Sequence, residues 1–387
     1  MDTQTQKTNP LLELKEQGQA IWLDHIQRSL MTSGELQRLI DEDGLSGMTS
    51  NPAIFEKAIV ETTDYNNALP KLSHAGLEPK AIYEKLAVED IRLAASIFEP
   101  VYRQTNGDDG YVSMEVSPHL ACDTRGTIQE ARRLWDAINR PNVMIKVPAT
   151  AEGMGAIEEL TALGINVNVT LIFSLDVYQD VAEAYIRGMK RLSQERSELS
   201  GVQSVASFFV SRIDTVVDKA IDQELSAAPS QKKAAALKSI RGKTAIANAK
   251  LAYERWEKIF SSGLWRKLQS RGAKTQRLLW ASTGTKDPNY RDVLYVESLI
   301  GPQTINTMPP ATFKAFKDHG QVSPTLTENI DQARATMNVL QTMGISFKVV
   351  TDQLLVDAVE KFLKPFDSLL AKLSDRAELA RAQDTSE

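Results

Sequence analysis

Short apolar runs, many rich in β-branched residues, recur along the chain and alternate with longer segments of helical periodicity. This alternation is typical of repeated strand–helix units around a parallel sheet. Eight runs are predicted as strands: Ala20–Asp24, Ser46–Ser50, Val112–Val116, Val143–Val147, Ile165–Thr170, Ser204–Phe209, Leu278–Ser282 and Gln303–Thr307. Eight units favour a closed barrel, an α/β fold of the (β/α)8 TIM type with extra helices. The alternative is an open doubly wound sheet, but no complete G-x-G-x-x-G follows a strand, and Gly153–Gly155 is only a fragment of one.

Amphipathic stretches between several strands are predicted as helices: Thr127–Asn139, Ala156–Leu163, Leu175–Leu192 and Ile213–Leu225. Thr127 and Ser174 are the expected N-cap residues. Two connections are longer than a minimal barrel needs, so we expect helical insertions near 53–110 and 226–276. We expect one barrel domain over 1–374, with a terminal helix at Gln353–Leu373 packed on the barrel and a polar, frayed tail over 375–387.

Composition narrows the classes of partner. The 387 residues are 42% hydrophobic, which is enough to bury a sizeable core, and 45 basic against 50 acidic residues give a net charge of −5. This balance lacks the electrostatic pattern of a nucleic-acid binder, so no nucleic-acid partner is expected. The stretch Gln231–Phe260 carries Lys232, Lys233, Lys238, Arg241, Lys243 and Lys250. It is better interpreted as a solvated outer helical face than as a binding surface.

The expected setting is the cytoplasm. A single cysteine, Cys122, excludes an internal disulfide and a cysteine-rich zinc site, and a reducing compartment is then the default. Met1–Lys7 lacks the apolar core of a secretory signal, and no later apolar run approaches the length that spans a bilayer. A cytoplasmic, soluble protein with no membrane partner is therefore expected. The long helices could form a homo-oligomer interface, but nothing in the sequence selects one.

Polar residues gather where the predicted strands end, which is where barrels of this type build their active sites. Lys146 interrupts the apolar run Val143–Pro148, a strand that should be buried on both faces. Burial disfavours the charged ammonium and favours a nucleophilic or Schiff-base lysine. The alternative is a strand-end lysine that reaches water or pairs with a carboxylate.

The neighbouring strands supply two polar faces at a period of two. Ser113, Glu115 and Ser117 share one face, and Asn166, Asn168 and Thr170 share the other. If these faces point into the barrel, they surround Lys146 with groups that suit a polyhydroxylated ligand. The alternative, that they point outwards, would set polar groups against the helices.

Two further residues, Asp24 and Arg212, each have a functional and a structural interpretation, and two other features bear on the chemistry of the site. Asp24 ends the first strand, but it could merely cap the next turn. Arg212 begins a helix after the sixth strand and could clamp a phosphate or form a surface ion pair. The segment from Ser282 to Lys286 adds hydroxyls, a glycine and a cation after the seventh strand. The four histidines have no H-x-x-x-H spacing, which argues against a metal site.

Five segments, taken together and in order, resemble the transaldolases, specifically the longer bacterial subgroup. They are Gly47–Pro52, Val112–Val116, Met144–Thr150, Ile165–Leu171 and Ser207–Asp214. The resemblance extends from about Trp22 to about Pro309. It implies a cofactor-free, metal-free enzyme of the non-oxidative pentose phosphate pathway. The implied reaction moves a dihydroxyacetone unit from sedoheptulose 7-phosphate or fructose 6-phosphate to glyceraldehyde 3-phosphate or erythrose 4-phosphate.

The resemblance also implies residue roles. Neutral Lys146 would attack the ketose C2 carbonyl, while Glu115, through a water held with Thr170, would shuttle protons as the carbinolamine dehydrates. Asp24 would take the C4 hydroxyl proton as the C3–C4 bond breaks. The hydroxyls of the remaining fragment would be held by Asn51, Asn168 and Ser207, and the phosphate by Arg212, Ser282 and Lys286.

Two alternatives are weighed against transfer. Fructose 6-phosphate aldolases, which release free dihydroxyacetone, usually carry glutamine at the position of Glu115 and tyrosine at that of Phe209, so this sequence favours transfer. A non-catalytic sugar-phosphate-binding barrel would lose the proton-transfer groups, yet Lys146, Asp24 and Glu115 are all present. One departure concerns the phosphate site: compact transaldolases have an arginine shortly after the seventh strand, where Lys286 stands here.

Overall fold

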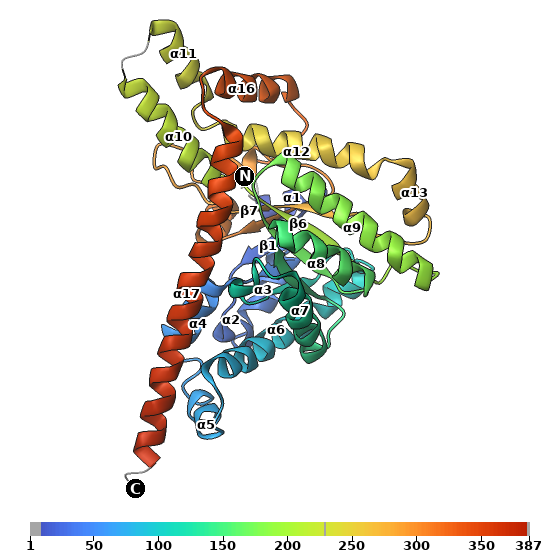
Figure 1. Cartoon of the computed structure of the whole chain (residues 1–387), viewed down its shortest axis with the longest axis vertical. Coiled ribbons are helices and arrows are strands. Elements are labelled where there is room, and N and C mark those ends of the chain that lie inside the picture. Colours follow the sequence, from blue (N-terminus) through green and yellow to red (C-terminus); the bar gives the residue numbers. More distant parts are fainter. Residues whose placement is uncertain (1–8, 228–229, 385–387) are drawn as a thin grey trace, which may run out of the picture.

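A closed barrel of eight parallel strands, paired in chain order from β1 to β8 and back to β1, forms the centre of the molecule (Figure 1). The computed structural model describes residues 9–227 and 230–384. The strands are β1 Gln19–Asp24, β2 Gly47–Thr49, β3 Tyr111–Glu115, β4 Val143–Pro148, β5 Val167–Ile172, β6 Ser204–Phe209, β7 Arg277–Ala281 and β8 Thr304–Met308. The prediction of a TIM barrel with extra helices is confirmed.

The strands can be recognised as apolar runs in the sequence because almost all of their residues are buried. Every strand residue is buried except Asp24, which is partly exposed at the carboxyl end of β1. Strands covered on both faces need continuous apolar runs rather than alternation. At the start of β2, the absence of a side chain on Gly47 leaves room for the indole ring of Trp22, which a Cβ atom would overlap. The barrel interior therefore depends on one glycine at that position.

Helices cover the outside of the barrel. The chain enters through α1 Pro10–Glu16 and forms α2 Arg28–Thr32 and α3 Glu35–Asp43 before β2. The helices that follow strands β3 to β6 are α7 Thr124–Ile138, α8 Ala151–Ala162, α9 Leu175–Glu195 and α10 Ser211–Ser226. Later come α14 Leu294–Glu297, α15 Pro310–His319 and α16 Ile330–Thr342. Between β3 and α7 lies a short 3₁₀ turn, η1 Pro118–Leu120.

One of the two predicted caps is confirmed. Ser174 caps α9, because its hydroxyl accepts the N–H of Val177 at 3.3 Å. The expectation for Thr127 was wrong: α7 begins at Thr124, where the Asp123 carboxylate accepts the N–H of Gly126 at 2.9 Å. An aspartate before the first turn is the stronger cap, and the Thr127 hydroxyl instead donates from inside α7 to the Leu120 carbonyl of the preceding 3₁₀ turn.

Extra helices fill both long connections. Between β2 and β3 lie α4 Pro52–Val60, α5 Leu69–His74 and α6 Pro79–Gln104. Between α10 and β7 lie α11 Gln231–Ile240, α12 Thr244–Phe260 and α13 Gly263–Gln269, whereas residues 228–229 lie outside the described residues. The expected solvated face of this second group was wrong for Lys250, which is 8% exposed and donates to the carbonyls of Thr325 and Glu328.

The last helix, α17 Phe347–Asp384, runs along the molecule beside α4 and α10 (Figure 1). It begins six residues before the predicted Gln353 and continues through 375–384, where a polar tail was expected; 385–387 lie outside the described residues. The tail sequence is rich in good helix formers. The Arg376 guanidinium also donates to the carbonyls of Ile59 and Val60 at the end of α4, which fixes the helix there.

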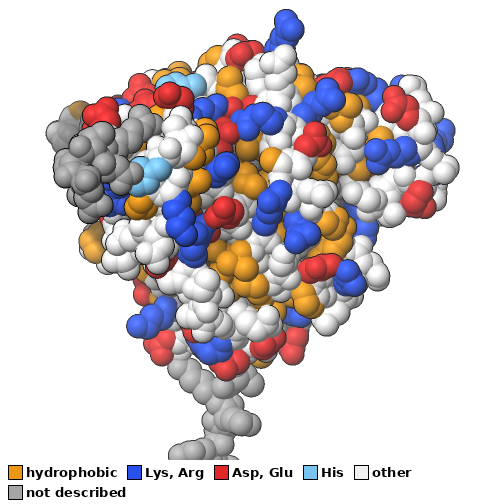
Figure 2. All heavy atoms as spheres, turned by 90° about the horizontal axis from the view of Figure 1, so that it is seen from below, with side chains coloured by type: hydrophobic (Ala, Val, Ile, Leu, Met, Phe, Trp, Pro, Cys, Tyr) orange, Lys and Arg blue, Asp and Glu red, His pale blue; other side chains and the backbone are white. Residues whose placement is uncertain are grey.

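Surface chemistry is mixed on the face seen in Figure 2, where acidic and basic side chains are interspersed. Within the described residues, no helix is long and apolar enough to cross a bilayer.

A buried carboxyl ties the second insertion to the barrel. Asp214 on α10 is 1% exposed, accepts the N–H of Ala245 at 2.8 Å and accepts the Tyr295 hydroxyl at 3.1 Å. Burial raises the pKa of Asp214 to about 7, although the hydrogen bond from Ala245 lowers it. Ionising this carboxyl in the folded protein is therefore unfavourable.

This carboxyl predicts a pH-dependent stability. Because the folded pKa lies above the unfolded value of about 3.9, Asp214 destabilises the fold increasingly as pH rises from about 4 to about 7. We expect Asp214→Asn to gain stability over the wild type across this window, by up to about 1.4 kcal/mol per pH unit. Urea unfolding between pH 5 and 8 measures the difference. Asp180→Asn, at an exposed position on α9, is the control; a pH-independent difference for Asp214→Asn would contradict the prediction.

Candidate active site

A cavity of about 170 Å³ opens at the carboxyl ends of the strands. Its lining includes nine of the eleven predicted site residues: Asp24, Asn51, Lys146, Thr170, Ser207, Phe209, Arg212, Ser282 and Lys286. They come from six different strand ends or from the segments that follow them. Residues far apart in the sequence thus meet because the closed parallel sheet brings all its carboxyl ends to one edge.

Lys146 lies at the floor of this cavity. Its side chain is 6% exposed, and its Nζ donates to the carbonyl of Ser50 at 2.9 Å and lies 3.6 Å from Oε2 of Glu115. Register explains the pairing, because Glu115 on β3 and Asn168 on β5 are the direct neighbours of Lys146 on β4. The polar faces predicted from period two therefore do converge on this lysine.

The surroundings of Glu115 shift the pKa of its carboxyl group. Burial raises the pKa of the Glu115 carboxyl to about 7, and nearby Asp24 raises it further, whereas Lys146 lowers it. Its Oε2 is buried and has no hydrogen-bond partner. A carboxyl with a pKa near neutrality can both donate and accept a proton at physiological pH. Glu115 is thus suited to general acid–base catalysis beside the lysine.

Asp24 ends a chain of hydroxyl groups. The Thr49 hydroxyl donates to Oδ1 of Asp24 at 2.7 Å and lies 2.8 Å from the Thr307 hydroxyl. Since Thr49 has one proton and gives it to Asp24, Thr307 must donate to Thr49. This chain of hydroxyl groups orients the Asp24 carboxylate, which lines the cavity, through a side chain rather than through the backbone of a following turn.

Asn168 lies one layer behind the cavity wall. It is fully buried, its Nδ2 donates to the Ser113 hydroxyl at 3.0 Å, and its Oδ1 accepts the Ser207 hydroxyl at 2.6 Å. Ser207 and Thr170 reach the cavity, and the buried Thr170 hydroxyl has no hydrogen-bond partner. Asn168 therefore orients Ser207.

Two members of the predicted polar faces lie away from Lys146. Asn166 lies near the amino end of the barrel, where its Nδ2 donates to the carbonyls of Pro141 and Val143. Ser117 lines a separate small cavity. A period of two gives the face of a strand but not the depth of a residue along the barrel, which is why these two were grouped with the site residues.

Cationic groups gather at the opposite side of the cavity. Arg212 is the second residue of α10, its guanidinium carbon lies 5.1 Å from the ring centroid of Phe209, and its Nη1 is buried without a partner. Burial lowers the pKa of Arg212, but a guanidinium remains charged at any physiological pH. Ser282, in a left-handed backbone conformation with φ 56°, and exposed Lys286 complete this side. An unpaired buried cation beside a helix N-terminus is suited to an anion.

Asn51 has a structural task as well. It is the N-cap of α4, where its side-chain oxygen accepts the N–H of Ile54 at 3.0 Å. It also lines the cavity, so the same side chain sets the direction of α4 and faces the ligand space.

Thr49, Thr307 and Phe362 are among the cavity residues that sequence reasoning did not assign to the site. Thr49 and Thr307 lie at predicted strand ends, and strand alternation could have found them. Phe362 comes from α17 and carried no local signal beyond its place in an apolar stripe. Its contact with the site depends on how the last helix packs.

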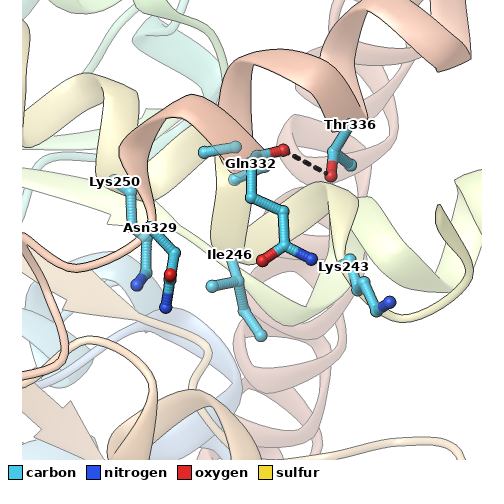
Figure 3. A pocket seen from close by; sticks show the side chains of 8 residues that line it. Lys243, Ile246, Lys250, Asn329, Gln332 and Thr336 are labelled. Carbon is cyan, nitrogen blue, oxygen red and sulfur yellow. Dashed lines mark hydrogen bonds between the residues drawn. The ribbon is translucent and has the colours of Figure 1, made fainter. Parts of the chain in front are cut away.

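A second cavity, of about 220 Å³, lies between α12 and α16 (Figure 3). Its buried cation, Lys250, already donates to two carbonyls, and the Thr336 hydroxyl donates to the Gln332 carbonyl. The barrel cavity, by contrast, holds unpaired buried groups on Thr170 and Arg212. Over residues 9–227 and 230–384, no cluster of His, Cys, Asp and Glu could hold a metal ion.

Comparison with known proteins agrees with this geometry. The family described as "Transaldolase/Fructose-6-phosphate aldolase" matches residues 21–373. "Transaldolase 2" of Nostoc sp. is 47% identical over 374 residues, covering 96% of this chain and 98% of the relative. "Transaldolase" of Thermobifida fusca is 45% identical over 369 residues, covering 95% and 98%. "Transaldolase 2" of Streptomyces avermitilis is 44% identical over 375 residues, covering 97% and 98%.

The chain belongs to the transaldolase family. It is an enzyme with transaldolase activity, a reaction of the pentose phosphate pathway, and its substrates are sugar phosphates. The barrel cavity of this family member is lined by Lys146 and Arg212, and Glu115 lies 3.6 Å from the lysine.

The raised pKa of Glu115 gives a pH prediction. The sequence predicts a covalent substrate adduct on Lys146, and in the wild type its formation should show an ionisation near pH 7 from Glu115. Glu115→Gln should abolish this ionisation and slow adduct formation by about 100-fold or more, the usual contribution of general acid–base catalysis. Single-turnover trapping between pH 5.5 and 8.5 measures both effects. Glu152→Gln, at an exposed position on α8, is the control, and an inflection that persists in Glu115→Gln would assign it to another group.

Proposed function

We propose that this transaldolase transfers a dihydroxyacetone unit from sedoheptulose 7-phosphate or fructose 6-phosphate to glyceraldehyde 3-phosphate or erythrose 4-phosphate, through a Schiff base on Lys146. The observation that carries the proposal is the pair formed by a lysine, 6% exposed, and a carboxylate 3.6 Å away whose pKa burial raises to about 7. Such a pair can hold a reactive amine and move protons beside it. No metal or other cofactor is part of the proposal.

Binding would begin at the cationic side of the cavity. The phosphate of the ketose lies against Arg212, Ser282 and Lys286, and the carbonyl reaches Lys146. Arg212 is the principal ligand, because it is buried and has an unpaired Nη1, whereas Lys286 is exposed. Exposed cations contribute less, since water screens them.

Schiff-base formation follows at C2. The neutral Lys146 amine attacks the carbonyl carbon, and the carbonyl oxygen takes a proton to give a carbinolamine. Glu115, through a water held with Thr170, then protonates the departing hydroxyl, which leaves as water, and an iminium remains. The buried Thr170 hydroxyl, which has no partner, supports this role.

Carbon–carbon cleavage uses Asp24. The carboxylate takes the C4 hydroxyl proton, and the electrons of the C3–C4 bond move into the iminium. The aldose phosphate leaves, and a three-carbon enamine stays on Lys146. Thr49 and Thr307 orient Asp24 for this step, whereas Asn51, Ser207 and, behind it, Asn168 hold the hydroxyls of the fragment.

Transfer reverses the same steps with a new aldehyde. The enamine carbon attacks the aldehyde carbon, and Asp24 returns a proton to the aldehyde oxygen. One water then hydrolyses the new iminium and releases the product ketose with free Lys146. The water lost in forming the first Schiff base is thereby regained.

Transfer is favoured here over simple aldol release. The wall beside Arg212 is the ring of Phe209, 7% exposed and 5.2 Å from the ring of Phe173. An apolar ring offers no hydroxyl to position a water that would hydrolyse the intermediate. Glu115 in place of glutamine supports the same conclusion.

The proposal needs only one chain, because every residue that it invokes belongs to the same barrel or to α17. A homo-oligomer, expected as an option from the long helices, stays untested. A cytoplasmic location is proposed on the basis of the single, exposed Cys122, a residue suited to a reducing compartment.

Borohydride trapping tests the nucleophile. With fructose 6-phosphate, reduction and digestion should place a three-carbon adduct on Lys146, and Lys146→Met should lose both the adduct and turnover while keeping its melting temperature close to that of the wild type. Lys286→Met is the matched control at the other lysine of the cavity, and its adduct should remain on Lys146. A folded wild type with no modified lysine would favour a binding-only barrel.

The base is tested by Asp24→Ala and the isosteric Asp24→Asn. Both should still form the imine, but cleavage should slow by about 100-fold or more because no carboxylate takes the C4 proton. Mass spectrometry after trapping should find the intact six-carbon adduct in place of the three-carbon one. Rapid appearance of the three-carbon adduct in both variants would remove Asp24 from this role.

A further inference from the structure

Phe362 brings an aromatic ring from the last helix to the catalytic lysine. The residue is 6% exposed, and its ring centroid lies 5.9 Å from Nζ of Lys146. It lines the barrel cavity together with residues that come from the strand ends. Its position on α17 means that a helix following the complete barrel supplies part of the active-site wall.

The ring separates two spaces. On one side is the cavity of about 170 Å³ that holds Lys146, and on the other is a small cavity of about 10 Å³ that is lined by Glu115, Ser117 and Val359. Phe362 lines both. A volume of about 10–15 Å³ is the least that holds one water molecule. The smaller cavity is at this lower limit, so bulk water does not fill the space on that side of the ring.

The ring is held firmly. One turn further along α17, the Phe366 ring makes an edge contact with Tyr83, at 5.4 Å between centroids. Glu56 on α4 accepts hydrogen bonds from Ser368 at 2.6 Å and from Lys372 at 2.9 Å. These contacts fix α17 across the helices of the first insertion (Figure 1). Phe362 therefore cannot leave the lysine unless the helix moves.

The three-carbon intermediate on the lysine can undergo transfer or hydrolysis, and access of water to it determines which reaction occurs. In transfer, the enamine carbon forms its new bond to an aldehyde carbon, and one water later frees the product. In the competing reaction, the enamine carbon takes a proton instead, water adds to C2 of the resulting iminium, the added water's proton is released, and the C–N bond breaks. The net reaction is enamine plus water giving dihydroxyacetone plus the free lysine amine.

We propose that Phe362 determines reaction specificity: its ring covers the site beside Lys146 and keeps bulk water and its protons from the enamine on that lysine. An apolar ring of this size offers no hydrogen bond to a water above the lysine. The inference deepens the proposed function and rests on Lys146 as the Schiff-base residue.

The test compares Phe362→Ala and Phe362→Leu with the wild type. Each enzyme is incubated with fructose 6-phosphate, with and without erythrose 4-phosphate, and free dihydroxyacetone and sedoheptulose 7-phosphate are quantified. We expect the ratio of released dihydroxyacetone to transferred fragment to rise about tenfold or more in Phe362→Ala, corresponding to about 1.4 kcal/mol, and by less in Phe362→Leu. Global damage to the fold would lower both products together and leave their ratio unchanged.

Controls separate the possible failures. Val356→Ala, at a 55% exposed position on the same helix, should keep the wild-type ratio. Phe362→Leu keeps most of the apolar volume and covers the case in which Phe362→Ala does not fold. Borohydride trapping is run in parallel: an unchanged ratio with a normal Lys146 adduct overturns the inference about Phe362 alone. A wild type without that adduct overturns the proposed function itself.

Discussion

The buried contact between Lys146 and Glu115 constrains the rest of the site. An amine and a carboxylate, each with a side chain 6% exposed, stand 3.6 Å apart at the end of two neighbouring strands. Removing such groups from water is costly unless each finds partners. The Ser50 carbonyl accepts a hydrogen bond from the lysine, but Oε2 of Glu115 has no hydrogen-bond partner. The free-energy cost of burial is therefore least compensated at Glu115. Burial raises the pKa of this carboxyl to about 7.

The last helix contributes to the surroundings of this pair. The ring of Phe362 on α17 lies 5.9 Å from Nζ of Lys146, and Phe362 and Val359 line the small cavity that Glu115 also lines. The same helix is anchored to α4, which begins at the cavity residue Asn51. The first insertion therefore serves two purposes, because it carries a site residue at its start and a support for the last helix along its length.

Much of this arrangement was predictable from the sequence, for identifiable reasons. All eight strands were found because parallel strands buried on both faces are continuous apolar runs. The convergence of Glu115, Lys146 and Asn168 followed from the common edge of a parallel barrel, although the roles assigned to these residues came from family resemblance. Depth along the barrel, which separates Asn166 from Asn168, is set by strand stagger and leaves no mark in a period-two pattern.

Tertiary contacts explain what the sequence could not predict. Lys250 was grouped with solvated lysines, but the loop before α16 folds over it and supplies two carbonyls. The helix expected to end at Leu373 continues because the Arg376 guanidinium donates hydrogen bonds to the last two carbonyls of α4. Phe362 is one apolar residue among several in a stripe, and only the docking of α17 distinguishes it from its neighbours. Each miss concerns a contact between segments that are distant in the sequence.

The two cations of the cavity differ in a way that bears on substrate binding. Arg212 is partly buried, burial lowers its pKa, and its buried Nη1 lacks a partner, whereas Lys286 is exposed to solvent. A guanidinium does not lose its proton to relieve this cost. The buried Nη1 therefore carries an unfavourable desolvation cost, which an anion that accepts its hydrogen bond would remove. Lys286, already hydrated, has no such cost to recover, so in the proposed function Arg212, at the start of α10, contributes more to phosphate binding than Lys286 does.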